Sequence, residues 1–141
     1  MAAEIKKANV KWVEKMKFVG TGYSGRSIVM DVPSTAGGDN SAVMPGELVL
    51  IGLGGCTGAD VVYMMNKMRT PFRDLKIDIE AEPVDSHPKV YKWIKIIYRF
   101  YGCDNREKAK KAVEMSREKY CSVSAILSKS ADVSYETVFE D

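Results

Sequence analysis

The sequence predicts an α+β domain with the element order β-β-β-α-β-β-α-α-β. Three observations lead to this prediction: short extended segments near the N-terminus, one long apolar stretch at residues 45–68, and two later segments with an apolar residue at every second position. Strands and helices that group in this way are typical of α+β proteins. A length of 141 residues is that of one ordinary domain, so we expect a single domain over residues 1–141.

The first 32 residues contain three short extended segments, at residues 9–13, 16–23 and 27–32. Polar and glycine-containing turns separate them, which favours an antiparallel meander. Residues 33–43 (PSTAGGDNSAV) are rich in Gly, Ser, Asp and Asn and are expected to form a loop. This loop is either a plain connector or one wall of a site.

A long helix is predicted from Pro45 to about residue 68. Proline suits the first turn of a helix, and the carboxylate of Glu47 complements the positive helix end. Two sets of residues define its expected faces: Leu48, Gly52, Gly55, Ala59, Val62 and Asn66 on one, and Val49, Leu53, Cys56, Val61 and Met64 on the others. A helix that is apolar nearly all round is buried on several sides. We therefore expect a second subunit to cover it, in an intertwined homodimer.

The second half of the chain begins with a predicted hairpin. Apolar residues alternate with charged ones at Leu75, Ile77, Ile79 and Ala81, and after a turn at residues 86–88 they do so again at Val90, Ile94, Ile96, Tyr98 and Phe100. Asp104 or Asn105 is expected to cap the next helix. A short helix within residues 120–130 and a last strand at residues 131–140 complete the order.

Composition and charge exclude several classes of protein. Net charge is +2, with 21 basic and 19 acidic residues mixed along the chain, so no nucleic-acid partner is expected. No segment reads as an uninterrupted apolar run of about 18 residues, and the charged N-terminus lacks the apolar core of a secretory signal. We therefore expect a cytoplasmic protein without a membrane partner.

The residues that remain as candidates for chemistry are thiols. The single histidine, His87, lies in a predicted turn, which leaves little support for a catalytic triad or a histidine-rich metal site. Cys56, Cys103 and Cys121 are an odd number without CxxC spacing, which argues against a disulfide scaffold or a zinc site. Cys103 is interpreted as structural or merely exposed.

Cys56 and Cys121 leave two interpretations open. Cys56 lies in the apolar helix, where a cysteine is often an inert small apolar residue. Cys121 lies where a short helix begins, and the free N–H groups there stabilise a thiolate. The two form a redox pair if the fold brings them together. Asp60, four positions after Cys56, shares its helix face and is either a hydrogen-bond acceptor for the thiol or a packing contact.

Two stretches, PGELVLIGLGGCTGADVVYMMNKMR and AVEMSREKYCSVSAIL, resemble the paired cysteine motifs of the OsmC/Ohr superfamily. The resemblance implies an intertwined α+β homodimer with antiparallel sheets around two long central helices. It also implies a thiol-dependent peroxidase of oxidative-stress defence that reduces organic hydroperoxides. Cys56 matches the peroxidatic cysteine and Cys121 the resolving one, a cellular dithiol is the reductant, and no cofactor or metal is implied.

The resemblance also bears on how the thiol is activated. In the family's peroxidases a glutamate directly follows the proline and pairs with an arginine beside the thiolate. Here Gly46 follows Pro45, and the carboxylate comes at Glu47. Nine helical positions put Glu47 and Cys56 on nearly opposite sides, so Glu47 is either a substitute or a helix cap. Arg26 is either the activating arginine or a surface turn residue.

Three functional hypotheses therefore follow from the sequence. The first is the peroxidase that uses Cys56 and Cys121. The second, favoured by Gly46, is a non-catalytic OsmC-like dimer that binds a small apolar ligand or acts as a redox sensor. The third is a sulfur-handling thiol enzyme.

Overall fold

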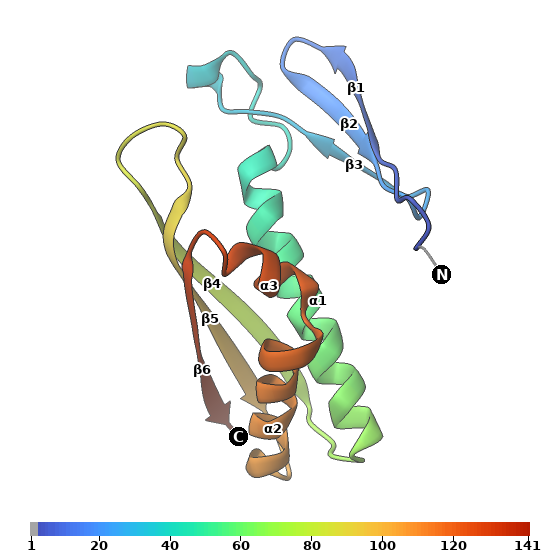
Figure 1. The fold of residues 1–141 in the computed structure, drawn as a ribbon, viewed down its shortest axis with the longest axis vertical. Coiled ribbons are helices and arrows are strands. Elements are labelled where there is room, and N and C mark those ends of the chain that lie inside the picture. Colours follow the sequence, from blue (N-terminus) through green and yellow to red (C-terminus); the bar gives the residue numbers. More distant parts are fainter. Residues whose placement is uncertain (1–2) are drawn as a thin grey trace. The chain divides into compact units, whose positions relative to one another are not determined.

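A computed structural model describes residues 3–141 (Figure 1). The strands are β1 (Asn9–Glu14), β2 (Lys17–Thr21), β3 (Ser27–Met30), β4 (Asp74–Pro83), β5 (Tyr91–Tyr101) and β6 (Asp132–Glu140). The helices are α1 (Pro45–Lys67), α2 (Arg106–Met115) and α3 (Ser122–Leu127), with a short 3-10 turn at Ser34–Ala36 and a π-helical turn at Ser116–Tyr120. The predicted order of strands and helices is confirmed.

The chain divides into two compact units, with the boundary between Val49 and Leu50. In the first unit, β1, β2 and β3 form an antiparallel sheet in sequence order, which confirms the predicted meander. Several apolar side chains of this sheet are exposed, Val10 and Trp12 to 61% and 58%. The single-domain assignment stays a prediction.

Asp31 organises the loop that follows the first sheet. Its carboxylate accepts hydrogen bonds from the backbone N–H groups of Val32, Asp39 and Ser41 and from the hydroxyl of Ser41, at 2.6–3.2 Å. The hydrogen bond from the Ser41 hydroxyl is the main cause that lowers the pKa of Asp31 well below its usual range. The predicted loop is therefore held by a buried carboxylate that the sequence analysis did not single out.

The second unit contains a three-stranded sheet in the order β4-β5-β6. β4 and β5 form the predicted antiparallel hairpin, but β6 runs parallel to β5. The prediction of antiparallel sheets is therefore wrong for this pair. The physical reason is the crossover through α2, the π-helical turn and α3, which brings the chain back to the end of the sheet where β5 begins.

One face of α1 packs into the core of this unit. Its buried residues are Leu53, Thr57, Val61 and Met65, which follow the i, i+4 spacing of a helix face. Its apolar members form one core cluster with residues of β5 and α2: Ile94, Ile96, Tyr98 and Phe100 of β5, and Ala109, Ala112 and Val113 of α2. Leu53 and Val61 belong to the second of the two predicted sets. The sequence did not select one buried face, because α1 is apolar nearly all round and carries no amphipathic signal.

By length and composition alone, α1 is also able to cross a membrane, with a mean hydropathy of 1.6 over 18 residues. The expectation that no segment qualifies was therefore wrong. The core helix of a soluble protein passes the same test. Here the packed face of α1 carries Thr57 in a buried hydrogen-bond network, which is the environment of a core helix.

A candidate dithiol site

Cys56, Asp60 and Cys121 meet in the second unit. Cys56 and Asp60 lie one turn apart on α1, and Cys121 directly precedes α3. The two sulfur atoms and one carboxylate oxygen of Asp60 all lie within 4.8 Å of one another. Both cysteines are free thiols, Cys56 half-buried and Cys121 buried. The fold thus brings together the two thiols that the sequence could only suggest as a pair.

The π-helical turn determines where Cys121 lies. α2 continues directly into this wider turn, which ends with the Cys121 N–H donating to the carbonyl of Ser116 at 2.8 Å. Cys121 then acts as the N-cap of α3, since its sulfur accepts a hydrogen bond from the N–H of Ser124 at 3.4 Å. The predicted break between two helices is therefore a π-helical turn, a feature that often occurs at functional sites.

The environment of Cys121 favours the neutral thiol. Burial, which leaves 4% of the residue exposed, is the main cause that raises the pKa of the Cys121 thiol above its usual value. The hydrogen bonds from Ser124 act in the opposite direction, but the net pKa is raised. The predicted effect of the helix start is present, because the hydrogen bond from the Ser124 N–H lowers the pKa of the Cys121 thiol, but burial outweighs it.

A chain of hydroxyl groups reaches Asp60 from the sheet. Tyr98 Oη and Thr57 Oγ1 are 2.6 Å apart, Thr57 Oγ1 and Ser116 Oγ are 2.7 Å apart, and Ser116 Oγ donates to Asp60 Oδ2 at 3.0 Å. Because an ionised carboxylate only accepts, the Ser116 proton points to Asp60. Thr57 then donates to Ser116 and Tyr98 to Thr57. Tyr98 is suited to be the first donor because burial raises its pKa to about 12.

A cavity of about 360 Å³ adjoins Asp60, where α1 meets the end of α2 and the π-helical turn. Its lining residues are Asp60, Tyr63, Met64, Lys67, Met115 and Tyr120. Aromatic rings and thioethers make most of this wall apolar. The cavity gives solvent or a small molecule a route to the carboxylate beside the two thiols.

Glu47 and Arg26 lie in the first unit. A carboxylate oxygen of Glu47 accepts a hydrogen bond from the N–H of Met44 at 2.8 Å, the contact of a helix cap. Arg26 is exposed, and its guanidinium donates to the carbonyl of Ser24 at 3.5 Å. Glu47 thus makes the contact that the capping interpretation predicts, and the activating roles of both residues stay predictions.

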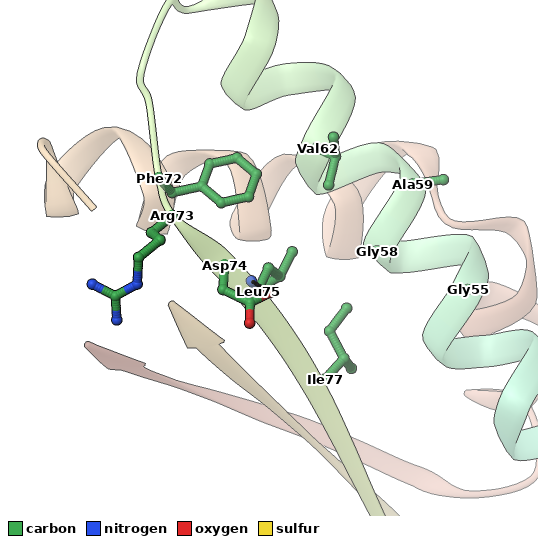
Figure 2. A pocket seen from close by; sticks show the side chains of 9 residues that line it. All are labelled: Gly55, Gly58, Ala59, Val62, Phe72, Arg73, Asp74, Leu75 and Ile77. Atoms are coloured by element: carbon green, nitrogen blue, oxygen red, sulfur yellow. Dashed lines mark hydrogen bonds between the residues drawn. The ribbon is translucent and has the colours of Figure 1, made fainter. Parts of the chain in front are cut away.

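A second hollow lies between α1 and the start of β4 (Figure 2). It has a volume of about 620 Å³ and is lined by Gly55, Gly58, Ala59, Val62, Phe72, Arg73, Asp74, Leu75 and Ile77. Packing within the chain explains the glycine at position 58, because an added Cβ would approach Ile77 Cδ1 to 2.9 Å. At Gly55 an added Cβ would meet no atom within 4 Å.

Sequence patterns identify the two thiols and Asp60, but they do not identify the chain of hydroxyl groups that reaches Asp60 from the sheet. Thr57 in a helix and Tyr98 in a strand look like ordinary core residues, and no motif in the sequence marks Ser116. The one available signal is that Thr57 follows Cys56 directly and therefore lies next to it on the buried side of α1.

Comparison with known proteins identifies relatives along nearly the whole chain. The model of the family described as "OsmC-like protein" matches residues 38–136. Protein YhfA of Escherichia coli K12 is 38% identical over 134 residues, which cover 93% of this chain and 97% of YhfA.

Solved structures agree with these matches. A hypothetical protein from Aquifex aeolicus VF5 has a TM-score of 0.80 and 30% identity, with 99% of this chain and 100% of that chain covered. An organic hydroperoxide resistance protein OsmC from Legionella pneumophila has a TM-score of 0.67 at 17% identity, covering 98% and 99% of the two chains, and shares the fold.

Proposed function

This chain belongs to the OsmC-like protein family, and on that premise we propose that it is a thiol-dependent peroxidase that reduces organic hydroperoxides in the cytoplasm. The family includes proteins named for hydroperoxide resistance, which supports a role in redox or peroxide stress. The observation that carries the proposal is the approach of the Cys56 and Cys121 sulfur atoms to within 4.8 Å.

The proposed reaction begins at Cys56, the less buried of the two thiols. Its thiolate attacks the terminal peroxide oxygen, so an S–O bond forms, the O–O bond breaks, and the alkoxide leaves as an alcohol after taking a proton. Cys56 is then a sulfenic acid. The half-buried position of Cys56 leaves it accessible to a small peroxide.

Cys121 resolves this sulfenic acid. Its sulfur attacks the Cys56 sulfur, the S–O bond breaks, and a disulfide and one water molecule form. The Cys121 proton balances the leaving hydroxide, and the Asp60 carboxylate, within 4.8 Å of the Cys121 sulfur, is able to carry it. The sulfur atoms have to approach from at most 4.8 Å to the disulfide length of about 2.05 Å. A cellular dithiol then reduces the disulfide by thiol exchange.

We further propose that Arg26 is the activating arginine and that Glu47 substitutes for the family's glutamate, each in place of its alternative as a surface turn residue or a helix cap. An Arg26→Ala variant should slow the first oxidation step, because a thiol without a neighbouring cation stays mostly protonated at neutral pH. Arg106→Ala removes an exposed arginine on α2 and is the matched control. Unaltered peroxide kinetics in Arg26→Ala would eliminate this assignment.

The functional unit in this proposal is a homodimer. On α1, Ile51 is 55% exposed and Tyr63 is 65% exposed. Large apolar side chains that are exposed together on one helix are typical of an interaction surface. The small residues Gly55 and Ala59 on the same helix would allow a second backbone to come close. Light scattering coupled to size exclusion tests this part directly.

Trapping of the sulfenic acid tests the proposed chemistry. Reduced Cys121→Ser protein is treated with one equivalent of cumene hydroperoxide and then with dimedone, and we expect one dimedone adduct on Cys56 by peptide mass spectrometry. Cys56→Ser should give none, and Cys103→Ser should behave as the unmodified protein does. Faster reaction with cumene hydroperoxide than with hydrogen peroxide would support an organic substrate.

A non-catalytic dimer that binds a small apolar ligand is the second candidate. The observation in its favour is the hydrogen bond from Met44 to Glu47, which engages the proposed activating carboxylate in capping its own helix. If the dimer only binds a ligand, Cys56 does not react with peroxide, and no dimedone adduct forms at one equivalent of peroxide.

A further inference from the structure

We propose that Cys56, Asp60 and Cys121 form a binding site for a thiophilic divalent cation, of which Zn²⁺ is the best match. The site uses the same thiols as the proposed peroxidase, but it depends only on their position and not on any reaction with peroxide. Two thiolates and one carboxylate are a donor set that Zn²⁺ accepts in proteins.

The spacing of the three donors fits one metal ion. Cys56 and Asp60 lie four positions apart, the i, i+4 arrangement that directs two ligands from one helix face to one ion. Cys121 supplies the third donor from the start of α3. Zn–S bonds of about 2.3 Å in a tetrahedral site place two sulfurs about 3.8 Å apart. Donor atoms that lie within 4.8 Å of one another need to shift by only about 1 Å to meet this geometry.

The charge at the site also favours a cation. Asp60 is half-buried, and no ion pair involves its carboxylate within residues 3–141. Its hydrogen bond comes from the neutral hydroxyl of Ser116. A partly buried carboxylate beside two thiols gains stability from a bound cation.

The hydroxyl chain behind Asp60 is arranged as an outer shell of such a site. Tyr98 donates a hydrogen bond to Thr57, Thr57 donates to Ser116, and Ser116 donates to Asp60 Oδ2. The last hydrogen bond holds the carboxylate in place. Partners of this kind hold a ligating carboxylate in one orientation and contribute about 10- to 100-fold to metal affinity.

The cavity beside Asp60 supplies an entry path and room for a fourth ligand. With three protein ligands, Zn²⁺ keeps one coordination position for water or another small ligand. Because both thiolates are used, a Cys56–Cys121 disulfide and a bound metal ion exclude each other. The proposal therefore predicts that the metal protects the thiols and that oxidation releases it.

The test is a titration of the reduced protein with Co²⁺, followed by displacement with Zn²⁺ in the presence of a chromophoric chelator. We expect one equivalent of Co²⁺ to bind with a thiolate-to-metal charge-transfer band and visible bands typical of tetrahedral coordination. Cys56→Ser and Cys121→Ser should lose or halve the charge-transfer band. Cys103→Ser is the matched control and should be unchanged.

Two further variants test the carboxylate and its support. Asp60→Asn should weaken Zn²⁺ binding at least tenfold, and Ser116→Ala should weaken it about tenfold or more. Far-ultraviolet circular dichroism confirms that each variant is folded. Protein oxidised with diamide, which requires no peroxide chemistry, should bind no metal.

Absence of stoichiometric binding by the reduced protein would overturn the proposal, and so would an unchanged affinity in folded Asp60→Asn. These results would leave the peroxidase untouched, since its test is the dimedone adduct on Cys56. Conversely, a protein that binds Zn²⁺ but gives no adduct supports the metal site and contradicts the peroxidase.

Discussion

The buried contact between Thr57 and Tyr98 allows a quantitative prediction. Both residues are fully buried, and their hydroxyl oxygens are 2.6 Å apart. Thr57→Val keeps the shape but leaves the Tyr98 hydroxyl without its hydrogen-bond partner, which costs about 1–3 kcal/mol. Tyr98→Phe removes that hydroxyl while Thr57 keeps Ser116, so we expect a loss of about 1 kcal/mol.

The double variant tests the pair as a unit. Once both partners are apolar, no hydroxyl is stranded, and the combined loss should be smaller than the sum of the single losses by about 1–2 kcal/mol. Urea unfolding at one fixed protein concentration measures the free energies, because a dimer makes apparent stability depend on concentration. Strict additivity of the two single variants would refute the hydrogen-bond chain as described.

Three further predictions concern other parts of the chain. Asn105→Ala should lower stability by about 1 kcal/mol in thermal unfolding, because the Asn105 side chain accepts the N–H of Lys108 at the start of α2; a loss within error would contradict this. Gly55→Ala adds a Cβ that meets nothing in its own chain, so it should weaken the proposed dimer in light scattering while a monomer would gain helix stability. Because folding lowers the pKa of Asp31, its contribution to the stability of the folded state is fully present above pH about 4 and is lost as the pH falls through the folded pKa. Asp31→Asn should therefore speed amide hydrogen exchange at Ser41 at neutral pH, and it should have no such effect below the folded pKa of Asp31.

Local patterns predicted most of the secondary structure. The period of two in β4 and β5, Pro45 at the first position of α1, and Asn105 as the cap of α2 are all properties of neighbouring residues, and the structure has them. The direction of β6, in contrast, could not be predicted from neighbouring residues. It depends on where the crossover through α2 and α3 ends, which no local pattern encodes.

The site was predicted only in part for a similar reason. Cys56 and Asp60 could be placed on one face because both belong to one helix, whereas the approach of Cys121 depends on the π-helical turn at Ser116–Tyr120. The sequence does not predict that turn, since its residues suit an α-helix equally well. The net pKa direction at Cys121 likewise depends on burial by residues distant in sequence.

The central claim is that peroxide converts Cys56 and Cys121 to one disulfide. The most direct measurement is peptide mapping of reduced protein after one equivalent of cumene hydroperoxide, with free thiols blocked before digestion. The account predicts a loss of two hydrogen atoms from the intact protein and a disulfide-linked pair of peptides that contain Cys56 and Cys121, with Cys103 blocked. Unchanged thiols, or a disulfide that includes Cys103 instead, would contradict it.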